Sequence, residues 1–186
     1  MKQLAAILLV FIVTGFSLPK EKGLIEYNEQ RELTWNDYKA RPNKASSFKA
    51  LTASRISFSA NSEGKLLKLN LQNYFEPHAS WTKTDKNKEL LEHERLHFHI
   101  SELFARKLRR QILQTKFKSS GQRLMNEVSK MYEEHMHELT QCQRRYDRET
   151  DHSIQVDKQE EWDFKIKSEL LTLKQFTNPS IEIELK

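Results

Sequence analysis

The sequence predicts an α+β fold, in which a small antiparallel sheet is followed by a helical domain. Two patterns in its 186 residues predict this order. Apolar residues alternate with polar ones in residues 56–60 and 66–74, which is the period of a strand with one buried face. From residue 96 onward they recur at every third or fourth position, the period of an amphipathic helix. A chain of this length is typical of one domain with its own core.

An apolar run near the N-terminus predicts a secretory signal peptide. A lysine precedes apolar residues 4–13, and the charged stretch 20–22 follows a few small and turn-forming residues. Even with its flanking residues the run is about 15 residues long, short of the roughly 20 that span a bilayer. We expect residues 1–18 to direct export to the periplasm or beyond the cell, with no stable membrane span left after cleavage. Residues 19–30 are expected to be a polar lead-in, and residues 31–186 a single domain.

The first part of this domain predicts a β-hairpin. Residues 48–60 and 66–74 carry the alternating pattern, and the turn-forming stretch 61–64 (NSEG) separates them. Residues 181–185 alternate as well, and they predict either a last strand or a frayed end.

Three helices are predicted after the hairpin. The first, capped by Asp85, spans residues 86–117, because its apolar residues keep helical spacing throughout. The second spans residues 122–145, and the third spans residues 156–173. Residues 146–152 are interpreted as part of a break between the second and third helices.

Residues 93–97, His93-Glu94-Arg95-Leu96-His97, fit the pattern H-E-x-x-H near the start of the first predicted helix. Histidines four positions apart project from one face of a helix, so both imidazoles reach a single ion at about 2.0–2.1 Å. A metal ion lowers the pKa of a bound water towards 7, and Glu94 can take a proton from that water and pass it to a leaving amine. The sequence thus predicts a zincin-like domain in which His93 and His97 bind Zn²⁺.

A catalytic zinc needs a third protein ligand and one open position. In longer forms of the motif a histidine follows six residues after His97 and a glycine precedes it, but Leu103 and Ile100 stand there. Glu102 lies about 140° around the helix from His97, at 100° per residue. His99 is also turned away, so we expect both side chains at the surface or beside the ligands.

The remaining histidines differ in their surroundings. His135 and His137 lie in a helical stretch, and we expect them to be solvated. His152 lies in the predicted break, where the backbone can aim a side chain and where oxygen donors can orient imidazoles. We therefore expect His152 to be the third ligand. If it is not, an acidic residue of the same break takes the role: Asp147, Glu149 or Asp151.

Four blocks of the chain resemble a known family. They are residues 31–38 (RELTWNDY), residues 93–98 (HERLHF) with Ala105-Arg106, Tyr146-Asp147 with Thr150 and His152, and Gln159 with Trp162. In this order they look like the bacterial domain of unknown function 922, a family described as secreted zinc-dependent proteases. The resemblance covers residues 31 to about 171, and it implies a metal site and peptidase activity. Ser153 stands where the family often has glycine.

The composition of the chain argues against several other classes of protein. With four glycines in all, the chain has no P-loop and no dinucleotide-binding fingerprint. The net charge of +5 comes with no nucleic-acid recognition motif, so we expect no nucleic-acid partner. Cys142 is the only cysteine, so an internal disulfide is excluded and the core must hold the fold by itself.

Two functions from different classes are compatible with these patterns. The first is a secreted zinc metallopeptidase that hydrolyses a peptide or protein substrate. Its residues would be the ligands His93, His97 and His152, the general base Glu94 and the oxyanion donor Tyr146. The second is a non-catalytic zinc-binding protein of the cell envelope. A fourth ligand such as Asp147 or Asp151 would favour it, because a closed site leaves no position for water.

Overall fold

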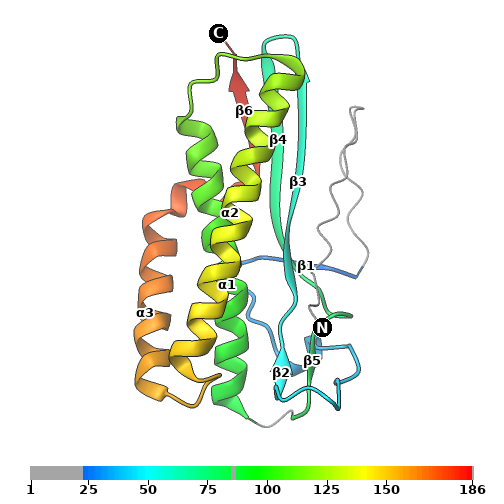
Figure 1. Cartoon of the computed structure of the whole chain (residues 1–186), viewed down its shortest axis with the longest axis vertical. Coiled ribbons are helices and arrows are strands. Elements are labelled where there is room, and N and C mark those ends of the chain that lie inside the picture. The colour runs from blue at the N-terminus through cyan, green and yellow to red at the C-terminus, as the bar shows by residue number, and fades with distance from the viewer. Residues whose placement is uncertain (1–22, 85–86, 186) are drawn as a thin grey trace.

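The protein has the predicted α+β architecture in a computed structural model that describes residues 23–84 and 87–185 (Figure 1). The elements in chain order are β1 (Ile25–Glu26), β2 (Ala50–Leu51), β3 (Ser54–Glu63), β4 (Leu66–Phe75), β5 (Trp81–Thr82), α1 (Lys88–Gln114), α2 (Gly121–Thr150), α3 (Val156–Thr172) and β6 (Ser180–Glu184). Two short 3₁₀ helices lie at Trp35–Asp37 and Lys174–Phe176. The predicted signal peptide lies outside the described residues. Among those residues, no helix combines the length and apolar character that a membrane crossing requires.

The predicted hairpin is formed by β3 and β4, which pair from Ser54 with Phe75 to Glu63 with Leu66. Strand β3 begins at Ser54, later than the alternation suggested. The other edge of β4 pairs with β1 at one end and with β6 at the other, so the predicted last strand is present. Strand β1 lies in the segment expected to be a polar lead-in. Strand β1, which precedes the hairpin, and β6, near the C-terminal end of the chain, therefore belong to the same sheet.

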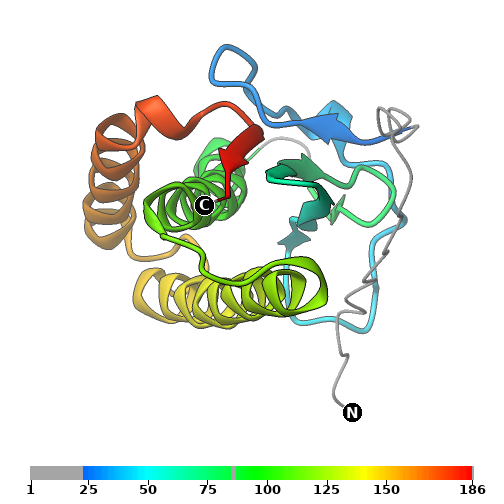
Figure 2. The same ribbon diagram turned by 90° about the horizontal axis from the view of Figure 1, so that it is seen from above.

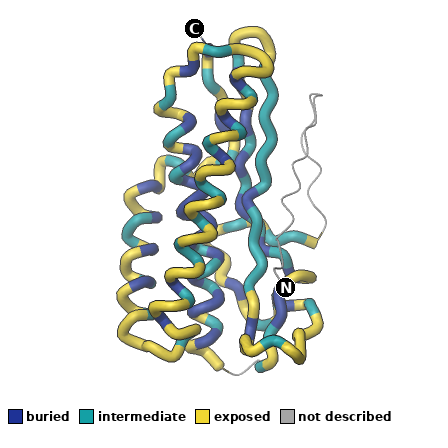
Figure 3. The backbone as a smooth tube through the Cα atoms, in the orientation of Figure 1, coloured by how far each residue is buried: buried dark blue, intermediate teal, exposed yellow. Residues whose placement is uncertain are grey.

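The main core lies between this sheet and α1. Alternate residues of β4, among them Leu67 and Leu71, are fully buried, and they face a buried stripe on α1 that includes Ile100 and Leu108. Figure 2 shows α1 enclosed by the sheet, α2 and α3. In Figure 3 the exposed positions of α2 and α3 lie mostly on their outer sides. Helix α1 is thus the central element, and it is surrounded by the sheet, α2 and α3.

Helix boundaries differ from the prediction at both ends of α1, which ends at Gln114 and not at residue 117, and at the end of α2. Asp85, the expected cap of α1, lies outside the described residues; instead the Asn87 side chain accepts a hydrogen bond from the Leu90 amide, at 2.7 Å. Helix α2 does not end at residue 145 but continues through Thr150. Its end is set by the left-handed residue Asp151, whose amide bonds back to the Asp147 carbonyl. Asp147 is therefore a helical residue and not part of a loop.

Glu102 is buried, and not at the surface or beside the ligands as the sequence suggested. Its Oε1 accepts hydrogen bonds from Arg106, at 3.0 Å, and from Arg109, at 2.9 Å. The two guanidinium groups also donate to the backbone carbonyls of Leu71 and Leu170. This buried ionic cluster links α1 to the sheet and to α3, since both carbonyls come from elements packed against it.

Candidate metal centre

The start of α1 and the last turn of α2 bring three potential ligands together. His93 Nε2 lies 3.2 Å from His97 Nε2, as expected for histidines four positions apart on a helix. Asp147 Oδ1 lies 3.2 Å from His93 Nε2 and 2.9 Å from His97 Nε2. These atoms form a compact group that could hold a metal ion.

The donor atoms fit a small tetrahedral cation. Ligand atoms held about 2.0–2.2 Å from a tetrahedral ion lie roughly 3.3–3.6 Å apart. The observed separations of 2.9–3.2 Å are within a few tenths of an ångström of that range. Two imidazole nitrogens and one carboxylate oxygen are also a ligand set that zinc accepts. A group of this kind supplies three protein ligands and leaves a coordination position for water.

Two glutamines orient the imidazoles. Gln159 Oε1 lies 3.0 Å from His93 Nδ1, and Gln143 Oε1 bonds to His97 Nδ1. Gln143 also donates its amide N–H to the His97 carbonyl at 2.9 Å, which fixes the direction of its own amide. Because an amide oxygen can only accept, each Nδ1 carries a hydrogen, and in the neutral form of each imidazole Nε2 then has the lone pair that can bind a cation. Such partners on the second ring nitrogen are typical of metal-binding histidines.

Tyr146 supports His93 from the other side. Its ring stacks on the His93 ring with centroids 4.5 Å apart. Its hydroxyl donates to Gln159 Oε1 at 2.7 Å and contacts the His93 carbonyl at 3.2 Å. In this arrangement the hydroxyl holds Gln159 and His93 in place. The role of Tyr146 as an oxyanion donor stays a prediction.

Glu94 lies in the interior next to this group. Only 4% of its surface is exposed, and its Oε2 has no hydrogen-bond partner among the described residues. A buried carboxylate oxygen without a partner is costly and is typical of an atom that engages water, an ion or a substrate. Its negative charge also contributes to raising the pKa of His97. Glu94 is therefore a buried carboxylate close enough to His97 to affect its pKa.

The charges of the group change the pKa values of Asp147 and His97. Burial raises the pKa of Asp147, but hydrogen bonds from His93 and His97 outweigh burial and hold that pKa well below the usual range of a carboxyl. Burial lowers the pKa of His97, but Asp147 and Glu94 outweigh it, and the net pKa of His97 is raised. A proton on an imidazole thus stabilises the negative charge of Asp147. A metal ion would compete with that proton for the same position.

His152 lies at the exposed edge of the group. Its Nδ1 is 3.5 Å from Asp147 Oδ1, and its ring centroid is 6.4 Å from that of His93 and 4.9 Å from that of Phe48. Three consecutive residues with positive φ, Asp151, His152 and Ser153, turn the chain back here. The structure thus brings His152 beside the three-residue group without making it a member of that group. Its role as a ligand stays a prediction.

The other predicted residues lie elsewhere. His99 Nδ1 bonds to the Tyr27 hydroxyl at 2.8 Å, away from the group. His135 bonds to the carbonyl of its own helix at Met131, and His137 is exposed. The carboxylate of Glu149 accepts from the Trp162 indole at 2.8 Å, so it faces α3. Among the acidic alternatives, Asp147 is the one that reaches both motif histidines.

Comparison with known proteins gives one family. The sequence model described as "Bacterial protein of unknown function (DUF922)" matches residues 30–153, which is 124 of the 186 residues. This range contains both motif histidines, Glu94, Asp147 and His152. No curated protein and no solved structure matches the chain.

Proposed function

The chain belongs to the DUF922 family of bacterial proteins, and from the geometry of its candidate metal centre we propose that it is a zinc-dependent peptidase. The observation that carries the proposal is the position of the buried Glu94 beside the group of His93, His97 and Asp147. A general base next to three ligands is the arrangement that metal-assisted hydrolysis of a peptide bond requires.

Each residue has a physical task in this reaction. When bound, a zinc ion supplies an electrophile that polarises a peptide carbonyl and makes a water ligand more acidic. His93, His97 and Asp147 would hold the ion, and Gln143 and Gln159 keep the two imidazoles turned towards it. Glu94 would accept a proton from water at its free Oε2 and then donate it to the leaving amine. Its burial removes competing solvent from that oxygen.

A second function is favoured by the position of His152. With its Nδ1 3.5 Å from Asp147 Oδ1, a small rotation would make His152 a fourth ligand. Four protein ligands close a zinc site, and a closed site is structural. The chain would then be a zinc-stabilised binding protein of the cell envelope. Hydrolytic activity distinguishes the two functions.

The test compares zinc-loaded wild type with Glu94→Gln in a screen of quenched fluorescent peptides. The variant keeps the shape of the side chain but cannot accept a proton, so we expect it to bind zinc normally and to lose at least about 100-fold in activity. Glu92→Gln is the matched control, because Glu92 is exposed and pairs with Arg95 at 2.6 Å. Full activity of Glu94→Gln would exclude Glu94 as the base. A wild type that binds zinc but cleaves nothing would favour the binding protein.

We also propose that the protein acts outside the cytoplasm. The support is the apolar run at residues 4–13 and the charged residues that follow it. We expect the mature chain to begin near Leu18. Sequencing the N-terminus of exported protein tests this, and a mature chain that still begins at Met1 would contradict it.

A further inference from the structure

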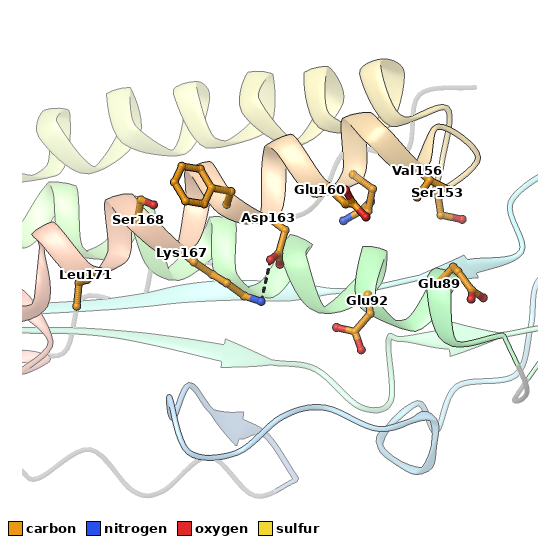
Figure 4. Close-up of a pocket in the computed structure, with 11 residues that line it drawn as sticks. Glu89, Glu92, Ser153, Val156, Glu160, Asp163, Lys167, Ser168 and Leu171 are labelled. Atoms are coloured by element: carbon orange, nitrogen blue, oxygen red, sulfur yellow. Dashed lines mark ion pairs between the residues drawn. The ribbon is translucent and has the colours of Figure 1, made fainter.

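A groove of about 670 Å³ runs between the start of α1 and the length of α3 (Figure 4). Its volume is in the range of sites that bind small molecules or short protein segments. Figure 4 shows Glu89 and Glu92 on α1, next to a row of α3 residues from Val156 to Leu171. Gln159 lines the groove as well, so the groove lies beside the metal centre without including any of its ligands.

The α3 side of the groove exposes large apolar side chains. Val156, Phe164 and Leu171 are 55%, 76% and 70% exposed. At 100° per residue, Phe164 and Leu171 lie about 20° apart around the helix, and Val156 lies about 80° from Phe164. The buried stripe of α3 that contains Trp162 and Ile166 lies on another side. An exposed apolar stripe along a groove is typical of an interaction site, whereas single exposed apolar residues are not.

The charges around this stripe are mostly negative. Glu89, Glu92, Glu160 and Asp163 line the groove against a single cation, Lys167. Lys167 is held by Asp163 at 2.8 Å, and Glu92 is held by an arginine outside the groove. Neither Glu89 nor Glu160 forms an ion pair with another described residue. Because the whole chain has a net charge of +5, this acidic groove is distinct from the rest of the molecule.

We propose that the groove binds an amphipathic helix of another protein, with an apolar face and flanking lysines or arginines. The apolar stripe from Val156 to Leu171 is about 23 Å long at 1.5 Å per residue, which matches four turns of a partner helix. Apolar anchors would pack on Phe164 and Leu171, as in other grooves that bind helices. Basic side chains would complement Glu89 and Glu160 and would select against acidic partners. This binding uses no metal ligand and does not depend on hydrolysis.

Fluorescence anisotropy at low ionic strength tests the proposal with a synthetic probe. The probe is a fluorescein-labelled helix of about 18 residues, five turns, with a leucine face and lysine flanks. We expect saturable binding to the full-length mature protein, with Phe164→Ser weakening binding by about tenfold or more, the scale of a lost apolar anchor. We expect Glu160→Lys to weaken binding as well, and most strongly at low salt.

Matched variants separate this groove from the rest of the surface. Leu113→Ser changes an apolar residue of α1 that is 45% exposed and lies outside the groove. Glu133→Lys changes an exposed glutamate of α2 that also lies outside it. Both should bind the probe like wild type. The proposal is overturned if wild type does not bind the probe, if the control variants lose as much affinity, or if a probe with glutamate flanks binds equally well. A wild-type dimer that Phe164→Ser dissociates would also overturn it, because the occupant would then be a second copy of this chain.

Discussion

Gln159 Oε1 and His93 Nδ1 lie 3.0 Å apart and join α3 to the start of α1. The same oxygen accepts the Tyr146 hydroxyl from α2, so one amide connects all three helices. Its position fixes which nitrogen of His93 carries the hydrogen. The direction of the His93 lone pair therefore depends on a residue that is not a ligand itself.

Gln159→Leu should weaken zinc binding by about 10- to 100-fold, the range found when partners of metal-binding histidines are removed. Leucine has a similar volume but accepts no hydrogen bond, so His93 can rotate and change tautomer. Competition with a chelator of known affinity measures the change. Gln141→Leu, on the exposed side of α2, is the control and should bind zinc like wild type. Equal affinities for both variants would show that Gln159 does not orient His93.

Glu102→Ala should destabilise the fold by about 3–5 kcal/mol, because it leaves Arg106 and Arg109 buried without their shared carboxylate. Asp163→Ala breaks an exposed pair and should cost less than about 1 kcal/mol. Urea denaturation followed by circular dichroism gives both values. A cost below about 1 kcal/mol for Glu102→Ala would mean that the cluster contributes little.

Ser153→Gly should stabilise the fold by about 1 kcal/mol. Ser153 has φ of 79°, a left-handed conformation that costs a residue with a side chain roughly 1–2 kcal/mol and costs glycine little. Ser129→Gly, inside α2, should instead destabilise by about 0.5 kcal/mol, since glycine is a poor helix former. Thermal unfolding of the two variants should therefore shift in opposite directions. A lower melting temperature for Ser153→Gly would show that the serine side chain is needed in this turn.

We expect His152 to keep the turn that contains it, residues 151–155, packed beside the metal centre. Removing zinc, or making His152→Ala, should increase proteolytic cutting within residues 151–155 severalfold, while α2 and α3 stay protected, because metal binding couples to local order. Limited proteolysis with mass spectrometry locates the cuts, and His137→Ala serves as the control. Unchanged cutting in the His152 variant would remove His152 from the set of possible ligands.

Much of the fold could be predicted from the sequence, because periodicity is a local signal. The turn-forming stretch 61–64 and the apolar spacing of α1 identified the hairpin and the first helix, although residues 61–63 belong to β3 and the turn itself lies at Gly64-Lys65. The end of α2 was predicted too early. Nothing in residues 146–150 breaks a helix, and the stop comes from left-handed residues that are not glycine, Asp151 to Ser153. Such a stop carries no compositional signal.

The candidate site could be predicted only in part, because only part of it is encoded by residues close together in the sequence. The spacing of His93 and His97 is local, so both positions follow from the motif. Asp147, Gln143 and Gln159 reach them from 46 to 66 residues away, and their contacts depend on how α2 and α3 pack on α1. Once residues 146–150 are known to be helical, Asp147 is fixed on the face of α2 that meets the motif. The burial of Glu102 likewise depends on distant parts of the chain. Its partners Arg106 and Arg109 also donate to the backbone carbonyls of Leu170 and Leu71.

We expect His93, His97 and Asp147 to hold one metal ion. The most direct test is zinc titration by isothermal calorimetry on the metal-stripped protein, with metal content checked by mass spectrometry. We predict about one zinc per chain for wild type, because three side chains and one open position define a single site. His93→Ala, His97→Ala and Asp147→Ala should each abolish binding, and His135→Ala and His137→Ala should leave it unchanged. Zinc binding that survives in Asp147→Ala, or that is lost equally in all five variants, would contradict a metal centre formed by these three side chains.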